Sequence, residues 1–221
     1  DSISFEYDLL NAIMTFNSHK RWKKNILNIA KKLKPKNALD IATGTADIAI
    51  NLGSISNCDV IGVDISEKML NVGREKIIKM KLTKAVRLES GDAENLNFKD
   101  NYFDLVTIGF GVRNFQDLEK GLSESLRVLK AKGTLIVLET SVPENRIMKL
   151  FYFIFTRTYI PIMAMIFSKD KSAYNYLLNS AELFPSGTKF KDILKSVGFS
   201  QVKINPKLFG SSTIYLSLIH I

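Results

Sequence analysis

Cysteine and histidine are scarce in this chain of 221 residues, which holds one cysteine and two histidines. A single cysteine cannot form an internal disulfide, so the sequence excludes a small secreted scaffold held together by such bonds. Cys58 stands where a strand is expected to begin, and a buried thiol in the reducing cytosol is its simplest interpretation. With so few sulfur and imidazole donors, no group of residues in the sequence has the spacing of a metal site.

A long uninterrupted apolar run is also missing. The most apolar stretch, residues 147–167, approaches the length of a membrane span, but Lys149, Arg157 and Pro161 interrupt it. A charge near the centre of a span costs about 2.5 to 3.5 kcal/mol, so we expect no span here. Two interpretations stay open for this stretch: ordinary core packing, or an apolar helical lid over a greasy substrate, because methionine adapts to irregular shapes.

The composition, 46% hydrophobic and 24% charged, is typical of a globular chain, and the length predicts a single domain over residues 1–221. The net charge is +9. Basic residues gather at 20–36, 68–87 and 189–207 among apolar residues at helical spacing, as on solvated helix faces. They do not alternate with aromatic residues as in a platform for single strands, so we expect no nucleic acid partner. An acidic membrane surface, or solubility alone, accounts for the charge.

The stretch of residues 37–64 organises the rest of the chain. Its first part is an apolar run of strand length, residues 38–42, which breaks at a turn and resumes as a helix-like segment from Asp47. A second apolar run, residues 60–63, ends in the carboxylate of Asp64. Strand, turn, helix and strand thus follow one another with the spacing of a βαβ unit that holds a nucleoside.

The composition of this turn favours one kind of ligand. Gly44 lets the backbone approach a ligand, and Asp64 can accept hydrogen bonds from both ribose hydroxyls. A dinucleotide fingerprint has three glycines around a pyrophosphate, whereas Asp40, Asp47 and Asp64 give this turn negative charge, which repels phosphate. A cation that carries an adenosine, S-adenosylmethionine, fits; an ordinary βαβ crossover is the alternative. We assign cofactor binding here to Asp40, Thr43, Gly44, Thr45 and Asp64.

Strand and helix patterns alternate along the rest of the chain. Further strands are expected at 85–90, 103–108 and 134–138, and an antiparallel pair at 201–208 and 212–218 around a Gly210-Ser211 turn. One helical face between them carries Leu118, Leu122, Leu126 and Leu129. We predict a Rossmann-like α/β fold with a doubly wound, mostly parallel seven-stranded sheet whose last strand is antiparallel.

The parts of this predicted domain follow one another along the chain. Two N-terminal helices are expected within residues 1–34, and a last helix begins the C-terminal part. The parts are the N-terminal helices at 1–34, the cofactor-binding half at 37–141, the apolar helical lid at 144–185, the C-terminal helix and strand pair at 188–218, and a tail at 217–221 that resembles non-native sequence.

Polar residues at strand ends are further candidates, because ligands gather where parallel strands end. Asp92 is a candidate acceptor for an adenine amino group, with a turn cap as the plain alternative. Gly109 and Gly111 leave room for a ligand, and Arg113 projects a permanent cation near it. His19 lies in a break between the N-terminal helices; a capping or packing role is the alternative to a catalytic one.

Taken together, these residues resemble the class I S-adenosylmethionine-dependent methyltransferases, and two stretches resemble the ubiquinone/menaquinone biosynthesis C-methyltransferase family. The first is similar in spacing to that family's N-terminal signature and carries Tyr7-Asp8, Asn11, Thr15, His19 and Trp22, with Leu10 and Thr15 where Met and Ser are usual. The second carries Arg127-Val128-Leu129-Lys130, Gly133, Glu139 and Ser141. There Ala131-Lys132 replace the usual Pro-Gly, a change expected to alter only a turn.

The resemblance implies an enzyme that methylates a ring carbon of a polyprenyl quinol with S-adenosylmethionine. Demethylmenaquinol is the favoured acceptor; a methoxy-benzoquinol of the ubiquinone pathway or a small phenol is the alternative. The resemblance carries the cofactor positions over to Thr45, Asp64, Asp92 and Ala93. The single thiol favours the cytoplasm, and the apolar stretch at 147–167 with the basic surface leaves peripheral contact with the inner face of the plasma membrane open. Methylation of a nucleic acid base, and a binding module without chemistry, are competing hypotheses, and a homodimer stays open.

The chemistry of carbon methylation suggests roles for three residues. A quinol carbon becomes nucleophilic when a hydroxyl loses its proton, so the protein must align and stabilise a phenolate. Arginine is too basic to act as the base, and we therefore assign Arg113 to holding the oxyanion. His19 or Tyr7 is the expected proton acceptor or relay.

Overall fold

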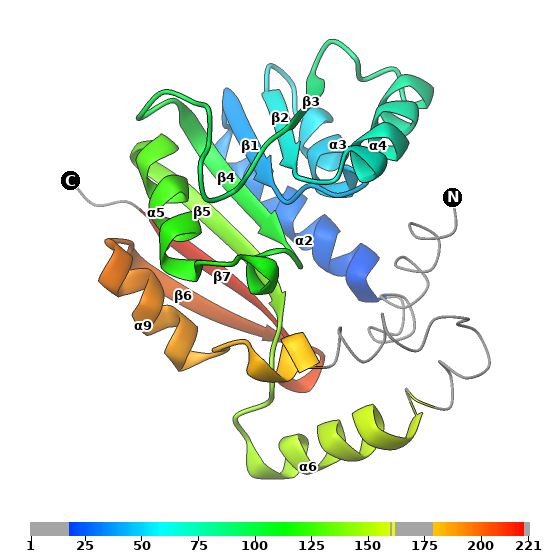
Figure 1. Cartoon of the computed structure of the whole chain (residues 1–221), viewed down its shortest axis with the longest axis vertical. Coiled ribbons are helices and arrows are strands. Elements are labelled where there is room, and N and C mark those ends of the chain that lie inside the picture. The colour runs from blue at the N-terminus through cyan, green and yellow to red at the C-terminus, as the bar shows by residue number, and fades with distance from the viewer. Residues whose placement is uncertain (1–17, 160, 162–178, 219–221) are drawn as a thin grey trace.

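The computed structural model describes residues 18–159, 161 and 179–218, and its centre is a seven-stranded sheet (Figure 1). The strands are β1 (Asn37–Ile41), β2 (Asp59–Asp64), β3 (Val86–Ser90), β4 (Phe103–Gly109), β5 (Leu129–Thr140), β6 (Ser200–Lys207) and β7 (Ser212–Leu218). They lie in the order β3-β2-β1-β4-β5-β7-β6. Strand β7 is antiparallel to both of its neighbours, and the other pairs are parallel. The predicted fold class is confirmed.

Helices cover both faces of the sheet. They are α2 (Ser18–Leu33), α3 (Asp47–Gly53), α4 (Glu67–Lys79), α5 (Leu118–Val128) and α9 (Thr188–Val197). Helices α2, α3 and α4 pack on one core, and α5 and α9 on the other. Along β5, Leu135 and Val137 belong to one core while Ile136 and Leu138 belong to the other, because alternate side chains of a strand point to opposite faces. Burial on both faces explains the continuous apolar runs of the central strands.

The start of β5 differs from the prediction. Leu129 was expected on the face of the preceding helix, but it has extended backbone and pairs with Phe103 of β4. Three extra residues of β5 then bulge before Thr134 pairs with Leu105. An apolar residue is buried in either position, so periodicity does not distinguish the end of the helix from the start of the strand.

The connection at the other end of the sheet also differs. The predicted Gly210-Ser211 turn is a short 3-10 helix, η3 (Leu208–Gly210), and Phe209 within it has a positive φ of 56°. The strand pair that it joins is confirmed as antiparallel.

The segment after β5 leaves the body of the sheet. Helix α6 (Arg146–Ile154) and the π-helical turn η2 (Phe155–Tyr159) lie beyond the ends of the strands (Figure 1). They form the described start of the predicted lid, of which residues 162–178 lie outside the described residues, as does the first predicted N-terminal helix. Within the described ranges, no helix has the length and apolar character that a membrane crossing requires.

Candidate functional site

The turn between β1 and α3 has an unusual backbone. Ala42, Gly44 and Ala46 all take positive φ angles, of 51°, 56° and 66°. This conformation suits glycine and is strained for alanine, because the left-handed region brings Cβ close to the backbone. Only the middle one of the three positions is glycine. The turn therefore has left-handed backbone at alternate positions, two of which are alanine.

Asp40 lies buried beneath this turn. Its two carboxylate oxygens accept hydrogen bonds from the hydroxyls of Thr43 and Thr107, each at 2.6 Å. Burial raises the pKa of Asp40 to about 6, although both hydrogen bonds act to lower it. Thr43, predicted as a cofactor residue, thus fixes the turn to the end of β1. Asp40 therefore keeps its negative charge at neutral pH and loses it only as the pH falls toward 6.

Asp64 closes β2 on the opposite side of the turn and is half-buried. Its oxygens accept the backbone N–H of Gly44 at 2.8 Å and that of Ser66 at 2.9 Å. Each carboxylate oxygen has two lone pairs, so these two bonds orient the group and leave acceptor capacity on it. The structure brings Asp64 and Gly44 together as the βαβ spacing predicted.

Asp47 is paired with cations that sequence reasoning did not place near it. Lys23 of α2 contacts it at 2.6 Å and Lys76 of α4 at 2.9 Å, and Lys76 also donates to the hydroxyl of Thr45 at 2.7 Å. Burial acts to raise the pKa of Asp47, but the two lysines outweigh it and the pKa lies below its usual value. Three helices are thus tied to the turn.

Two adjoining cavities form a cleft beside the turn, which we call the turn cleft. One, of about 170 Å³, extends from Asp40 and the 43–45 turn to Lys23 and Met69. The other, of about 310 Å³, lies against Asp92 and Ala93. They share Ala42, Asp64, Gly111 and Asn114. All seven predicted cofactor residues line the first cavity, the second or both, and Thr43 and Thr45 do so although they are largely buried.

The loop after β3 bounds the second cavity. Asp92 is exposed, and one of its oxygens accepts the N–H of Glu94 at 2.9 Å. It therefore caps a turn, which was the alternative to a contact with adenine. Glu94, which the sequence did not single out, accepts the N–H groups of Gln116 and Asp117 at 2.6 and 3.0 Å. It joins the loops after β3 and β4 across the cleft.

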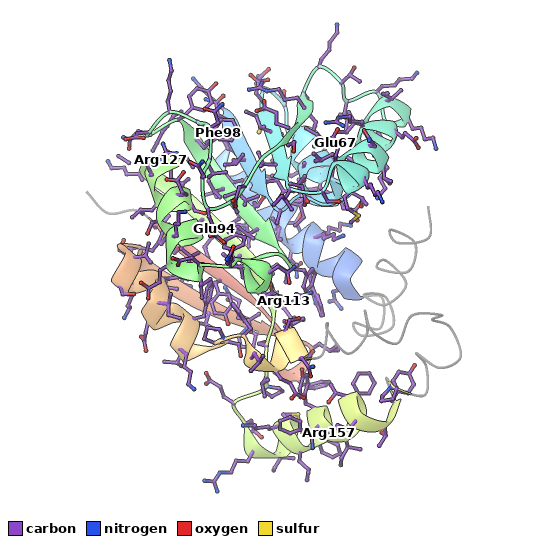
Figure 2. The ribbon with its side chains drawn as sticks, in the orientation of Figure 1. Glu67, Glu94, Phe98, Arg113, Arg127 and Arg157 are labelled. Atoms are coloured by element: carbon purple, nitrogen blue, oxygen red, sulfur yellow. The ribbon has the colours of Figure 1, made fainter. Side chains whose placement is uncertain are left out.

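Arg127, part of the second signature, supports the same loop from outside. Its guanidinium donates to the carbonyls of Leu96 and Phe98, each at 2.8 Å, and contacts Glu124 and Asp100. Figure 2 labels Arg127 and Phe98. The loop that carries Asp92 is therefore held at both ends. The arginine of the second signature therefore has a structural role, because it fixes the wall of the turn cleft.

Arg113 lies on η1 (Val112–Asn114), directly after β4 (Figure 2). Its side chain is 1% exposed and forms an ion pair with Glu139 of β5, which is 0% exposed. Glu139 also accepts the N–H of Thr140 at 2.7 Å and its hydroxyl at 3.1 Å. The arginine predicted to project toward a ligand is thus held rigidly by a buried carboxylate at the ends of two strands.

A second hollow, the side cavity, has a volume of about 410 Å³. It is lined by Val112, Arg113, Phe115, Leu118, Asn179, Ser180, Leu183, Phe184 and Pro185. Phe115 lines both this cavity and the turn cleft, so η1 and the residue after it separate the two. An apolar hollow with one cation therefore adjoins the cleft.

The two glycines near the end of β4 have a packing role as well. A Cβ at Gly109 would lie 2.2 Å from Cδ1 of Ile48, and one at Gly111 would lie 2.4 Å from Cβ of Ala42. Both positions line the turn cleft, as expected. Glycine is required there because neighbouring segments of the chain come into close contact. Of the other predicted residues, His19 lies in the first turn of α2, where only its backbone is described, and Tyr7 lies outside the described residues.

The turn cleft fits a nucleoside joined to a small cation. The oriented carboxylate of Asp64 stands at the junction of its two cavities, and the left-handed turn brings backbone close to the same point. The fold and this cleft define a class I S-adenosylmethionine-dependent methyltransferase.

Comparison with known proteins narrows this class. The model of the ubiE/COQ5 methyltransferase family matches residues 1–218, and the chain belongs to that family. It is 41% identical to a demethylmenaquinone methyltransferase of Bacteroides fragilis over 216 residues, 97% of this chain and 88% of that protein. It is 37% identical to a ubiquinone/menaquinone biosynthesis C-methyltransferase UbiE of Geobacter sulfurreducens, over 96% of this chain and 84% of that protein.

A solved structure shares the fold. The S-adenosylmethionine-dependent methyltransferase of Aquifex aeolicus superposes with a TM-score of 0.63 at 18% identity, covering 87% of this chain and 88% of that one. At this identity the likeness concerns the fold alone.

Proposed function

We propose that this methyltransferase methylates a ring carbon of a polyprenyl quinol, with demethylmenaquinol as its acceptor. The observation that carries the proposal is the 41% identity, over nearly the whole chain, to a protein named for that reaction. The apolar side cavity beside the turn cleft supports it, since a prenylated ring needs an apolar site next to the methyl donor.

The donor's place in the proposal is the turn cleft. S-adenosylmethionine, when bound, supplies a methyl group on a positively charged sulfur. Asp64 would accept the ribose hydroxyls, and the wall at Asp92 and Ala93 would lie against the adenine. The turn at Thr43, Gly44 and Thr45 would face the rest of the donor. Hydrogen bonds from Gly44 and Ser66 hold the Asp64 carboxylate in place before any ligand arrives.

The acceptor's place is the side cavity, at the wall formed by Val112, Arg113 and Phe115. Arg113 keeps its charge at any physiological pH and would stabilise the oxyanion of an ionised quinol. Glu139 acts through Arg113 as a positioning residue, because it fixes the guanidinium without lining the cavity. His19 or Tyr7 stays our proposal for the group that accepts the hydroxyl proton.

The test is product analysis with purified protein. Labelled methyl donor and a short-chain demethylmenaquinol should yield a ring-methylated product by mass spectrometry. A methoxy-benzoquinol serves as the second acceptor, because a relative at 37% identity is named for both pathways. Methylation of the benzoquinol alone would move the assignment to the ubiquinone pathway, and methylation of neither would contradict the proposal.

Asp64→Ala tests the donor site separately. We expect donor affinity by calorimetry to fall roughly ten- to a hundredfold, because hydrogen bonds to a charged group contribute about 1.5 to 3 kcal/mol. The matched control is Asp59→Ala, which removes an exposed carboxylate at the other end of the same strand. Equal donor affinity in the two variants would show that Asp64 does not hold the ribose.

A further inference from the structure

Helix α6 exposes an apolar stripe to solvent. None of its residues is buried, and four large apolar side chains recur at positions i, i+3, i+4 and i+7. These are Ile147 (63% exposed), Leu150 (60%), Phe151 (61%) and Ile154 (51%), which we call the α6 stripe. Such spacing places them along one side of the helix. A contiguous exposed patch of this kind marks a binding surface.

The residues around the stripe are basic. Arg146, Lys149 and Arg157 are exposed on α6 and η2, and residues 146–159 contain no acidic side chain. Lys149 and Arg157 both lie over the ring of Phe153, at 5.9 and 5.1 Å from its centroid. Long basic side chains that pack along an apolar surface while their charged ends reach water suit the interface of a bilayer with anionic headgroups. The chain's net charge of +9 has the same sign.

Another side of the segment formed by α6 and η2 faces the protein. Tyr152 is half-buried, and Thr156, one turn further on, is fully buried. Burial and Glu182 raise the pKa of the Tyr152 hydroxyl to about 12, and the Arg113 cation acts against this rise. The segment is thus exposed along the stripe and packed on the protein at Tyr152 and Thr156.

We propose that the α6 stripe docks this enzyme on an anionic lipid bilayer, with α6 lying in the plane of the headgroups. The inference rests on the proposed function, because a polyprenyl quinol resides in the bilayer. The apolar side chains would insert into the bilayer, and the basic residues would give the protein a preference for anionic lipid.

The experiment is flotation with vesicles of anionic phosphatidylglycerol and neutral phosphatidylcholine. The triple variant Ile147→Ser, Leu150→Ser and Phe151→Ser should bind anionic vesicles at least about tenfold more weakly than the parent protein, because it loses three apolar side chains that insertion would bury in the bilayer. The matched control is Ile78→Ser with Met80→Ser, which changes exposed apolar side chains at the end of α4 and should float normally. Lys149→Gln with Arg157→Gln should reduce the preference for anionic over neutral vesicles.

A second measurement does not depend on loss of binding. Phe151→Trp adds a fluorophore to the stripe, whereas the chain's natural tryptophan, Trp22, is 3% exposed in the core. Brominated lipid should quench the new tryptophan and leave the parent protein's fluorescence unchanged. Unquenched fluorescence, or equal flotation of the triple variant and the parent protein, would overturn the proposal. If the triple variant instead dissociates a dimer that forms without lipid, the stripe is a contact between copies and the proposal fails.

Activity separates this inference from the proposed function. The triple variant should methylate a water-soluble short-chain quinol at the parent rate and lose turnover of a long-chain quinol embedded in vesicles. Equal loss on both acceptors would contradict docking while leaving the methylation itself intact. A parent protein that floats yet methylates neither quinol would instead contradict the proposed function.

Discussion

The turn cleft holds its charged side chains in hydrogen bonds within the protein, whereas helix α6 exposes its large apolar side chains to solvent. In the cleft, Asp40, Asp47 and Asp64 each accept hydrogen bonds from named groups of the surrounding elements. On α6, the large apolar side chains of the stripe meet solvent. The difference follows from what each region is proposed to bind. A small, charged donor demands oriented dipoles fixed in advance, whereas a bilayer demands exposed apolar area without fixed geometry.

Arg113 lies on η1, which separates the turn cleft from the side cavity, and removing it should have the largest effect. Arg113→Ala leaves the buried carboxylate of Glu139 without its cation, a loss of about 3 to 5 kcal/mol in unfolding free energy. The double variant Arg113→Met with Glu139→Leu should recover much of this stability, since apolar pairs often replace buried ion pairs at little cost. If Arg113 holds the oxyanion, turnover stays low in the double variant while donor binding is kept. Recovered turnover would limit Arg113 to a structural role.

Asp40, in the turn cleft, should make the unfolding free energy of the protein depend on pH. Its pKa rises from 3.8 to about 6 on folding, so between these values the unfolded chain has lost a proton that the native protein keeps. This group alone therefore lowers the unfolding free energy as pH rises from about 4 to about 6, by up to about 3 kcal/mol, and adds no further change above that window.

The measurement for Asp40 is urea unfolding of the parent protein and Asp40→Asn from pH 4 to 7. The difference between the two stability curves isolates this carboxyl from the groups whose pKa is lowered, such as Asp47. We expect the variant to gain stability relative to the parent as pH rises through the window. Parallel curves would mean that Asp40 has an ordinary pKa.

The smallest expected effect lies far from both regions, in the bulge of β5. Lys132 has a φ of 64° there, and it occupies the position where the family pattern has glycine. Lys132→Gly should raise the unfolding free energy by about 1 kcal/mol, because a left-handed residue with a Cβ is strained by about 1 to 2 kcal/mol. The neighbouring Gly133→Ala should destabilise, since its Cβ would lie 2.7 Å from the carbonyl oxygen of Lys130. A lower unfolding free energy for Lys132→Gly than for the parent protein would show that the backbone at Lys132 is not strained.

The sequence alone determined the order of strands and helices along the chain and led to the predicted place of the donor. Apolar runs of strand length, a turn with Gly44, and an acid about twenty residues later are local patterns, and the parallel sheet follows from their alternation. The pairing of Asp64 with Gly44 was predictable for the same reason, because strand ends in a βαβ unit meet at one edge of the sheet.

Only the tertiary structure decided how the charges of the site are balanced. Lys23 and Lys76 neutralise Asp47 from two other helices, and Glu139 holds Arg113 across 26 residues of sequence. Periodicity shows which side of a helix is apolar, but not which distant side chain lies opposite a given carboxylate. The same limit applies to the α6 stripe, whose residues match a core pattern and are exposed because nothing in the described chain packs against them. Local pattern fixes the elements, and packing between distant elements fixes the electrostatics and the exposed surface.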